Sequence, residues 1–551
     1  MRPTRITALA LALTMTAPLI SCADNSESLS GDDSSASKTT SAKETSTDSS
    51  GSTYSGEYRI AYEPFDLDEL REHPLALLED IKKPGNRDKV SEDIELLLSD
   101  WRLVQDASSR ITLNYYLDFE NEELEAENDR CSEDAYVYSL LTALALTRCY
   151  EKDEYSDLAE DYIDDNMLEV FESPSMTAKR VEGYARVDYE LSDELLDEYY
   201  DLYSDEDIDE DEKALRCAEI YLNVLRGNES SIEDIYRDYC RDFDTETVAD
   251  MTDAVIDSIL PAYMDLYDAF SEMDGADDIL YDPPEIDEPF TIIQKYAPRL
   301  NNDIARLADK IIDEELYCFT GDEAAYPGSF TTSLPLTDDA FIFINHMDDM
   351  YAMSTAVHEF GHFCSAYNYD GGRYNTPMCL DIAEIQSQGF EFLFTQFYDD
   401  IYGDLAEPMK AYRVLDMLDS TIGGFMVGKF ENEVITRLDE LEPEDVITIW
   451  NDVCGDVFSI NFYDIPHVFE SPGYYLSYGT SALAAFDIWR DCSKSLSKAQ
   501  EKYEKISKVD VYSYDTQFCK SLKSCGFSDV MSVKYVRSLA DEIEEYADSL
   551  S

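Results

Sequence analysis

The chain has 551 residues, of which 44% are hydrophobic and 12% aromatic, and a formal net charge of −78. The apolar content is too high for a disordered protein and sufficient for a folded body of enzyme size. The negative charge would repel nucleic acid phosphates and anionic lipid headgroups. We therefore expect neither of these as a binding partner.

The first 22 residues have the pattern of a bacterial lipoprotein signal. Arg2 and Arg5 form a basic start, an apolar stretch runs to Ile20, and the small Ser21 precedes Cys22. The end of this segment resembles a lipobox, where the signal is cut and the cysteine then carries a lipid. We therefore expect a protein of the bacterial cell envelope, lipid-anchored to the membrane through Cys22, with its body on the extracytoplasmic side. The alternative is an ordinary secretory signal with an incidental cysteine.

A polar segment, residues 23–56, separates this signal from the rest of the chain. It is dominated by Ser, Thr, Asp, Gly, Lys and Glu without apolar periodicity, which predicts a flexible, solvated tether. No later segment has 18 or more uninterrupted apolar residues, so the folded body is expected outside the bilayer. Eleven cysteines remain besides Cys22, an odd number without a repeated CxxC spacing, and they predict no particular disulfide framework.

Residues 57–290 are predicted to form an N-terminal helical region. Apolar residues recur there at mixed spacings of three and four, as at Tyr136 and Leu140. The proline-rich segment 282–284 interrupts the helical pattern, and it predicts a boundary near that point. We assign the remainder, residues 291–551, to a catalytic region.

Two short strands and then two helices are expected at the start of that region. Residues 326–332 and 340–345 are strand-like and predict a small β-sheet. Helices are predicted over residues 351–369 and 380–398. We also expect the strand at 340–344 to pair with an extended peptide, because added strands recognise backbone amides while tolerating varied side chains.

The first of these helices contains an HExxH motif. His358 and His362 lie four residues apart, so both imidazoles are on one helical face and can bind one metal ion, with Glu359 beside the open position. With only five histidines in 551 residues, composition alone would produce this motif in roughly one such chain in two hundred. The motif predicts a catalytic zinc site with Glu359 as general base.

The second helix supplies the third ligand that catalytic zinc normally requires. Glu384 follows His362 by 22 residues and completes a set for one Zn²⁺ per chain. Glu391 lies two helical turns further on the same face. It is predicted to orient one of the metal ligands without binding the metal itself. Asp381, one turn earlier, is the competing candidate for that role.

These residues resemble the thimet oligopeptidase and oligoendopeptidase F family of metallopeptidases. That family carries HExxH followed by a glutamate ligand in a Glu-x-x-Ser-x-x-x-Glu setting, which Glu384, Ser387 and Glu391 match. The resemblance implies a mainly α fold, namely a large helical zincin of the HExxH gluzincin type with a deep substrate channel. It further implies short peptide substrates and a small β-sheet beside the active-site helix. We expect a monomer.

A third block, residues 466–479, looks like the family's histidine followed by a tyrosine-rich loop. On this resemblance His467, Tyr474 and Tyr478 are catalytic candidates, and Tyr475 is a candidate for substrate binding. A tyrosine hydroxyl or a histidine N–H can donate to the oxyanion that forms when a peptide carbonyl is attacked. Aromatic packing is the alternative explanation in a chain with 40 tyrosines.

The predicted reaction is zinc-dependent hydrolysis of internal bonds in short peptides. A zinc carboxypeptidase of the Taq type is one alternative, because its glutamate motif also resembles the segment 384–388. A peptide-binding lipoprotein that has kept the metal site without turnover is the other. The intact Glu359 argues against this last alternative.

Overall fold

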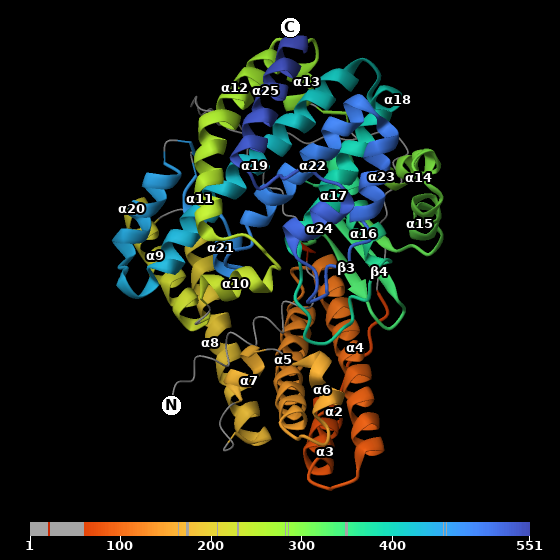
Figure 1. Cartoon of the computed structure of the whole chain (residues 1–551), viewed down its shortest axis with the longest axis vertical. Helices are drawn as coiled ribbons and strands as arrows, with labels where there is room; N and C mark the ends of the chain where they lie inside the picture. The colour runs from red at the N-terminus through yellow and green to blue at the C-terminus, as the bar shows by residue number, and fades with distance from the viewer. Residues whose placement is uncertain are drawn as a thin grey trace, which may run out of the picture.

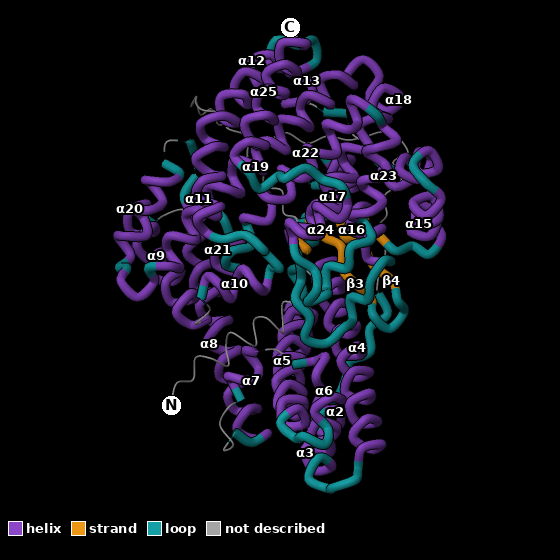
Figure 2. The backbone as a smooth tube through the Cα atoms, viewed as in Figure 1, coloured by secondary structure: helices purple, strands orange, loops and turns teal. Residues whose placement is uncertain are grey.

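The computed structural model describes the strand Ile20–Ser21 and residues 60–163, 165–171, 176–205, 208–228, 231–281, 283–284, 286–347, 351–455, 457–458 and 460–550. Helices make up most of the described chain, with one small sheet at their centre (Figures 1 and 2). The predicted mainly α fold class is therefore confirmed. The predicted signal and tether, including Cys22, lie outside the described residues apart from Ile20–Ser21.

The first helices form an elongated bundle at the bottom of Figure 1. Helices α4 and α5 lie side by side, α3 packs against both of them, and α8 packs against α5. The side chain of Asn121 accepts hydrogen bonds from the first free amides of α5, whose acidic first turn also suits the positive end of the helix dipole. The bundle comprises α2 (Leu67–Leu70), α3 (Glu72–Asp80), α4 (Arg87–Leu117), α5 (Glu122–Tyr150), α6 (Ser156–Ala159), α7 (Asp165–Val170) and α8 (Ala178–Ser204).

A second group of helices leads to the sheet. The predicted break is confirmed, because one helix ends at Tyr281 and the next begins at Pro289, where a missing amide hydrogen costs nothing. The group comprises α9 (Glu210–Asn228), α10 (Ile232–Asp238), α11 (Thr245–Ala254), α12 (Leu260–Ser271), α13 (Ala276–Tyr281), α14 (Pro289–Tyr296) and α15 (Asn302–Asp313).

The sheet has the strand order β1-β3-β4-β2. Strands β3 (Ser329–Leu334) and β4 (Asp339–Asn345) form the predicted pair and run antiparallel, whereas β2 (Tyr317–Thr320), which was not predicted, runs parallel to β4. The two-residue β1 (Ile20–Ser21) pairs with β3. The expectation that the strand at 340–344 takes up a peptide is wrong, because β4 is already hydrogen-bonded to a strand on each side.

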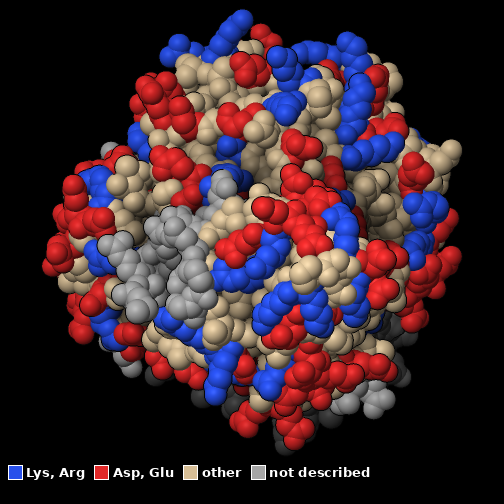
Figure 3. All heavy atoms as spheres, turned by 60° about the horizontal axis from the view of Figure 1, so that its bottom comes forward, with Lys and Arg blue, Asp and Glu red and all other residues tan. Residues whose placement is uncertain are grey.

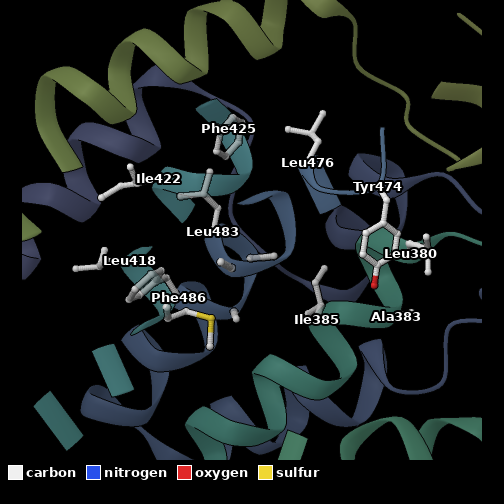
Figure 4. Close-up of a cluster of buried hydrophobic side chains, with 14 of the residues drawn as sticks. Leu380, Ala383, Ile385, Leu418, Ile422, Phe425, Tyr474, Leu476, Leu483 and Phe486 are labelled. Atoms are coloured by element: carbon white, nitrogen blue, oxygen red, sulfur yellow. The ribbon is translucent and has the colours of Figure 1, made fainter. Parts of the chain in front are cut away.

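The two helices that contain the predicted metal ligands lie in the interior of the upper half of the molecule in the view of Figure 1. Helix α16 (Ala352–Ala366) packs against α17 (Leu380–Phe394), which in turn packs against α22 (Leu476–Lys494). Figure 4 shows how apolar side chains of α17, α19 and α22 fill the space between these helices. The remaining helices are α18 (Tyr398–Tyr402), α19 (Ala406–Thr436), α20 (Pro443–Val453), α21 (His467–Glu470), α23 (Leu496–Ile506), α24 (Phe518–Cys525) and α25 (Val533–Leu550).

Two large hydrophobic cores organise these helices. One runs from Phe65 to Ala185 and includes Tyr374, and the other runs from Tyr199 to Ala547. The predicted division of the chain at residue 290 stays a prediction. None of the described helices is long and apolar enough to cross a bilayer.

The surface reflects the acidic composition. Asp and Glu side chains cover much of the face in Figure 3, with Lys and Arg side chains between them. The eleven cysteines of the described chain are free thiols, and nine of them are buried.

Candidate metal centre

The close approach of α16 and α17 brings the three predicted metal ligands together. A Cβ atom at Gly361 would lie 2.7 Å from the Cα atom of Ser387 and 2.8 Å from the carbonyl oxygen of Gln386. Real Cβ atoms do not approach backbone atoms so closely, so only glycine at this position lets the two helices touch. This contact places Glu384 of α17 next to the two histidines of α16.

The three predicted ligands point their coordinating atoms at one another. The Nε2 atoms of His358 and His362 are 3.2 Å apart, and Oε2 of Glu384 lies 3.5 Å from the first and 3.7 Å from the second. A tetrahedral Zn²⁺ about 2.0–2.2 Å from each ligand atom would set such atoms about 3.3–3.6 Å apart. The spacing therefore fits a zinc ion, and these three residues form a group of the described chain that could hold a metal ion.

The surroundings of His362 and Glu384 favour the protonation states that bind a metal. Desolvation lowers the pKa of His362 to about 4, so the imidazole is neutral at neutral pH. Burial alone would raise the pKa of Glu384, but its hydrogen bond to His358 and the nearby His362 bring that pKa below its usual value. A neutral imidazole and a carboxylate are the ligand forms that zinc requires.

The buried Glu391 can orient His358 through the ring nitrogen that faces away from the metal position. Oε1 of Glu391 lies 2.8 Å from Nδ1 of His358, so an Nδ1–H can donate to it while Nε2 faces the metal position. The other carboxylate oxygen of Glu391 accepts a hydrogen bond of 2.5 Å from Arg413 of α19, which also pairs with Asp416. The structure thus puts Glu391 where the sequence analysis expected a residue that orients a ligand.

The competing candidate, Asp381, has a different partner. Its carboxylate forms an ion pair with Arg241, and both side chains are fully buried. It also accepts a hydrogen bond of 2.6 Å from Ser477. Asp381 is therefore bound to residues outside α16 and α17.

The predicted base, Glu359, is fully buried beside strand β3. The hydroxyl of Thr331 donates to Oε2 of Glu359 at 2.6 Å. Such a hydrogen bond restricts the orientation of the carboxylate. The sheet therefore supplies a partner for the residue that would move protons.

The tyrosine-rich loop approaches the centre from the side of α22. The rings of His467 and Tyr474 stack with centroids 5.1 Å apart, and the hydroxyl of Tyr474 donates to Oε1 of Glu384 at 3.4 Å. In Figure 4 this hydroxyl points toward α17. The hydroxyl of Tyr478 donates to that of Tyr474 at 3.3 Å. His467, Tyr474 and Tyr478 thus form one cluster against the metal ligands.

The ring of Tyr475 lies beside this cluster. Its centroid is 5.4 Å from that of Tyr478 and 6.1 Å from that of His467, and a Cβ atom at Gly423 would touch it. Tyr475 is therefore near the other aromatic residues but lies against α19. Its role in substrate binding stays a prediction.

The sequence analysis missed three residues that the structure brings to this region. Thr331, Arg413 and Arg241 each bind an acidic residue of α16 or α17. They come from a strand, a helix and a loop that are distant in the sequence, and none belongs to a motif. No local signal in the sequence could have identified them.

Comparison with solved structures gives consistent likenesses in fold. A candidate oligoendopeptidase F is 17% identical with a TM-score of 0.63, covering 89% of this chain and 98% of its own. PZ peptidase A with an inhibitor gives the same identity, TM-score and coverage. A candidate oligoendopeptidase F from Bacillus anthracis str. Ames is 16% identical with a TM-score of 0.61, covering 89% of this chain and 97% of its own. No family model and no curated protein matches the chain.

Proposed function

We propose that this chain, which has the fold of the oligoendopeptidase F structures, is a zinc-dependent peptidase that hydrolyses internal bonds of short peptides. The observation that carries the proposal is the triangle of 3.2, 3.5 and 3.7 Å between the coordinating atoms of His358, His362 and Glu384. The predicted base Glu359 follows His358 on the same helix. A structural histidine pair would not need a third, fully buried carboxylate at these distances. The fold of known peptidases adds support.

The reaction needs an activated water and a base. When bound to the three ligands, Zn²⁺ would lower the pKa of a water molecule to about 7 and polarise the peptide carbonyl. Glu359, oriented by Thr331, takes a proton from the attacking water and delivers it to the leaving amine. Glu391 keeps His358 in the tautomer that presents Nε2 to the metal position.

The aromatic cluster would stabilise the oxyanion that develops on the attacked carbonyl. Tyr474 and Tyr478 are both candidate donors, because the hydroxyl of Tyr474 is directed at Glu384 and that of Tyr478 is directed at Tyr474. His467, stacked on Tyr474, can donate through an imidazole N–H. A deep channel around this cluster, as the family resemblance implies, would admit extended short peptides and exclude folded proteins.

The test compares the soluble form lacking residues 1–22 with its Glu359→Gln variant. Zinc content and cleavage of a mixed quenched-fluorescent peptide library are measured for both. We expect about one zinc per chain in both proteins and a loss of roughly 10²- to 10⁴-fold in rate for the variant. Unchanged turnover in the variant would contradict the role of Glu359, and absence of zinc from both would contradict the metal centre.

The products of the parent protein separate the possible activities. Internal fragments support an endopeptidase, whereas release of single C-terminal residues supports a carboxypeptidase. Zinc binding without any cleavage supports a peptide-binding protein.

We propose in addition that the protein is anchored in a bacterial envelope by lipid on Cys22, on the evidence of the sequence at the end of the signal. The test is partitioning between a detergent phase and an aqueous phase, using lysates of cells that express the full chain or its Cys22→Ser variant. We expect the parent in the detergent phase and the variant in the aqueous phase. The same partitioning for both would contradict the anchor.

A further inference from the structure

Arg241 connects the metal-ligand helix to the tyrosine-rich loop. It lies between α10 and α11, in the region predicted as N-terminal, and its side chain is fully buried. Its Nε and Nη2 atoms lie 3.1 Å from the carboxylate oxygens of Asp381, on α17 one turn before Glu384. Nη2 also donates to the carbonyl oxygen of Gly473 and to the hydroxyl of Ser477, each at 2.9 Å.

The loop is held at both backbone polar groups of Gly473, its carbonyl oxygen and its amide. Arg241 binds the carbonyl oxygen, and Oε1 of Glu431 on α19 accepts a hydrogen bond of 2.7 Å from the amide. Gly473 has a φ of +83°, and a Cβ atom there would lie 2.6 Å from Ile235. Because Tyr474 is the next residue, the direction of its side chain depends on how the buried side chains of Arg241 and Glu431 hold Gly473.

The guanidinium is itself fixed in place by aromatic rings. Its Cζ atom lies 4.7 Å from the centroid of Tyr239 and 5.3 Å from that of Tyr236. A planar group with several donors can bind a carboxylate, a carbonyl and a hydroxyl at once while it packs on a ring, and an ammonium cannot. A buried ion pair adds little net stability compared with apolar residues. Folding stability alone therefore does little to explain why Arg241 and Asp381 occupy these buried positions.

We propose that Arg241 is a positioning residue that sets Tyr474 and Tyr478 relative to the metal ligands by tying Gly473 and Ser477 to Asp381. The proposal rests on the proposed function, because it assigns the tyrosines to that same reaction. A displacement of about 1 Å in such groups can reduce a rate about 10²-fold. The N-terminal region thereby determines the geometry of the catalytic cluster.

The test is Arg241→Lys in the soluble form, which keeps the positive charge near Asp381 but cannot make all these contacts. Arg490→Lys is the matched control, because Arg490 is also buried, pairs with Glu542 and lies over the ring of Tyr535, far along α22 from the tyrosines. We expect both variants to fold and to bind about one zinc. We expect kcat to fall about 10- to 100-fold only for Arg241→Lys, with KM nearly unchanged.

A double-mutant cycle separates positioning from a general structural role. In a Tyr474→Phe/Tyr478→Phe background, Arg241→Lys should have little further effect on kcat, because the groups that it positions are gone. The same loss of kcat in both backgrounds would overturn the proposal. So would a kcat for Arg241→Lys equal to that of Arg490→Lys.

Hydrogen exchange provides a readout that does not depend on activity. Arg241→Lys should speed exchange of the amides at 473–478 and leave the central amides of α17 protected. Unchanged exchange at 473–478 would overturn the proposal even if the parent showed no peptidase activity. If the parent is inactive and exchange does rise, the proposed function fails while the role of Arg241 in holding the loop stands. A second variant, Ser477→Ala, removes one contact and should give a smaller change of the same kind.

Discussion

The four buried acids around the predicted metal position have different partners, and these partners suit them to different chemical roles. Glu384 faces two imidazoles, Glu391 lies between His358 and Arg413, and Glu359 accepts a hydrogen bond from Thr331. Asp381, on the same helix as two of these acids, pairs with Arg241 instead. Residue type alone therefore does not distinguish a ligand from a base, a ligand-orienting acid or an anchor.

Replacing Glu391 with glutamine should weaken zinc binding. The amide can still accept from His358 but lacks the negative charge that makes the imidazole a stronger ligand. We expect zinc affinity to fall about 10- to 100-fold, measured by competition with a chelator. Glu431→Gln, at a buried glutamate bound to Gly473, serves as the control and should keep the parental affinity. Parental affinity in the Glu391 variant would contradict the proposed orientation of His358.

Glu431 should make the folding stability depend on pH. Burial raises its pKa to about 8 in the folded protein, whereas in the unfolded chain it titrates near 4.5. The folded state therefore holds a proton that the unfolded state releases, and stability falls as pH rises from about 5 to 8, by at most about 1.4 kcal/mol per pH unit.

Glu431→Gln removes this titration, and the amide can still accept from Gly473. The melting temperature of the variant relative to the parent should therefore rise between pH 5 and pH 8 and change little above pH 9. Calorimetric melting curves of both proteins across this range provide the measurement. A difference between the two proteins that does not vary with pH would show that Glu431 is ionised in the folded state.

At the scale of elements, the contact between α16 and α17 determines whether a metal centre exists. The two histidines are fixed relative to each other by one helix, but Glu384 reaches them only because Gly361 lets the helices touch. Helix α22 then covers the other face of α17 and brings the tyrosines to Glu384.

Gly361→Ala should disturb the protein and its metal centre together. The added Cβ atom would meet the backbone of α17, which cannot move like a flexible side chain, and we expect a loss of about 1–3 kcal/mol in folding stability with weaker zinc binding. Gly183→Ala in α8 is the matched control, because no atom lies within 4 Å of its Cβ position. That variant should gain about 0.5–1 kcal/mol. Equal stabilities and zinc affinities for the two variants would contradict this account.

At the scale of the whole molecule, electrostatic self-repulsion opposes folding. The formal net charge is −78, and acidic side chains cover much of the surface seen in Figure 3. Salt shortens the range of repulsion between exposed charges, with a screening length of about 10 Å at 0.1 M.

The melting temperature should therefore rise as NaCl is increased from about 0.02 M to about 0.5 M. Zinc-loaded protein at fixed pH is the appropriate sample, because loss of metal would otherwise contribute. A control series in sucrose at constant low ionic strength separates screening from general solute effects. A melting temperature that falls with NaCl would mean that attractive ion pairs outweigh the repulsion.

The sequence alone predicted the metal ligands, the base and the helical fold, and the structure confirmed the helical fold. Two histidines four residues apart on a helix must share a face, so local geometry was sufficient to pair them. The Glu-x-x-Ser-x-x-x-Glu setting of the family resemblance then indicated Glu384 as the third ligand and Glu391 as its neighbour on a second helix. The likeness in fold to the oligoendopeptidase F structures agrees with the family resemblance read from those motifs.

Only the tertiary structure decided which residues hold these groups in place. Thr331, Arg413 and Arg241 reach the acids of α16 and α17 across long sequence separations, and the strand order placed β4 inside the sheet rather than at an edge. Such contacts leave no periodicity or spacing in the sequence. They depend on how close-packed helices and strands settle against one another, which is a property of the whole folded chain.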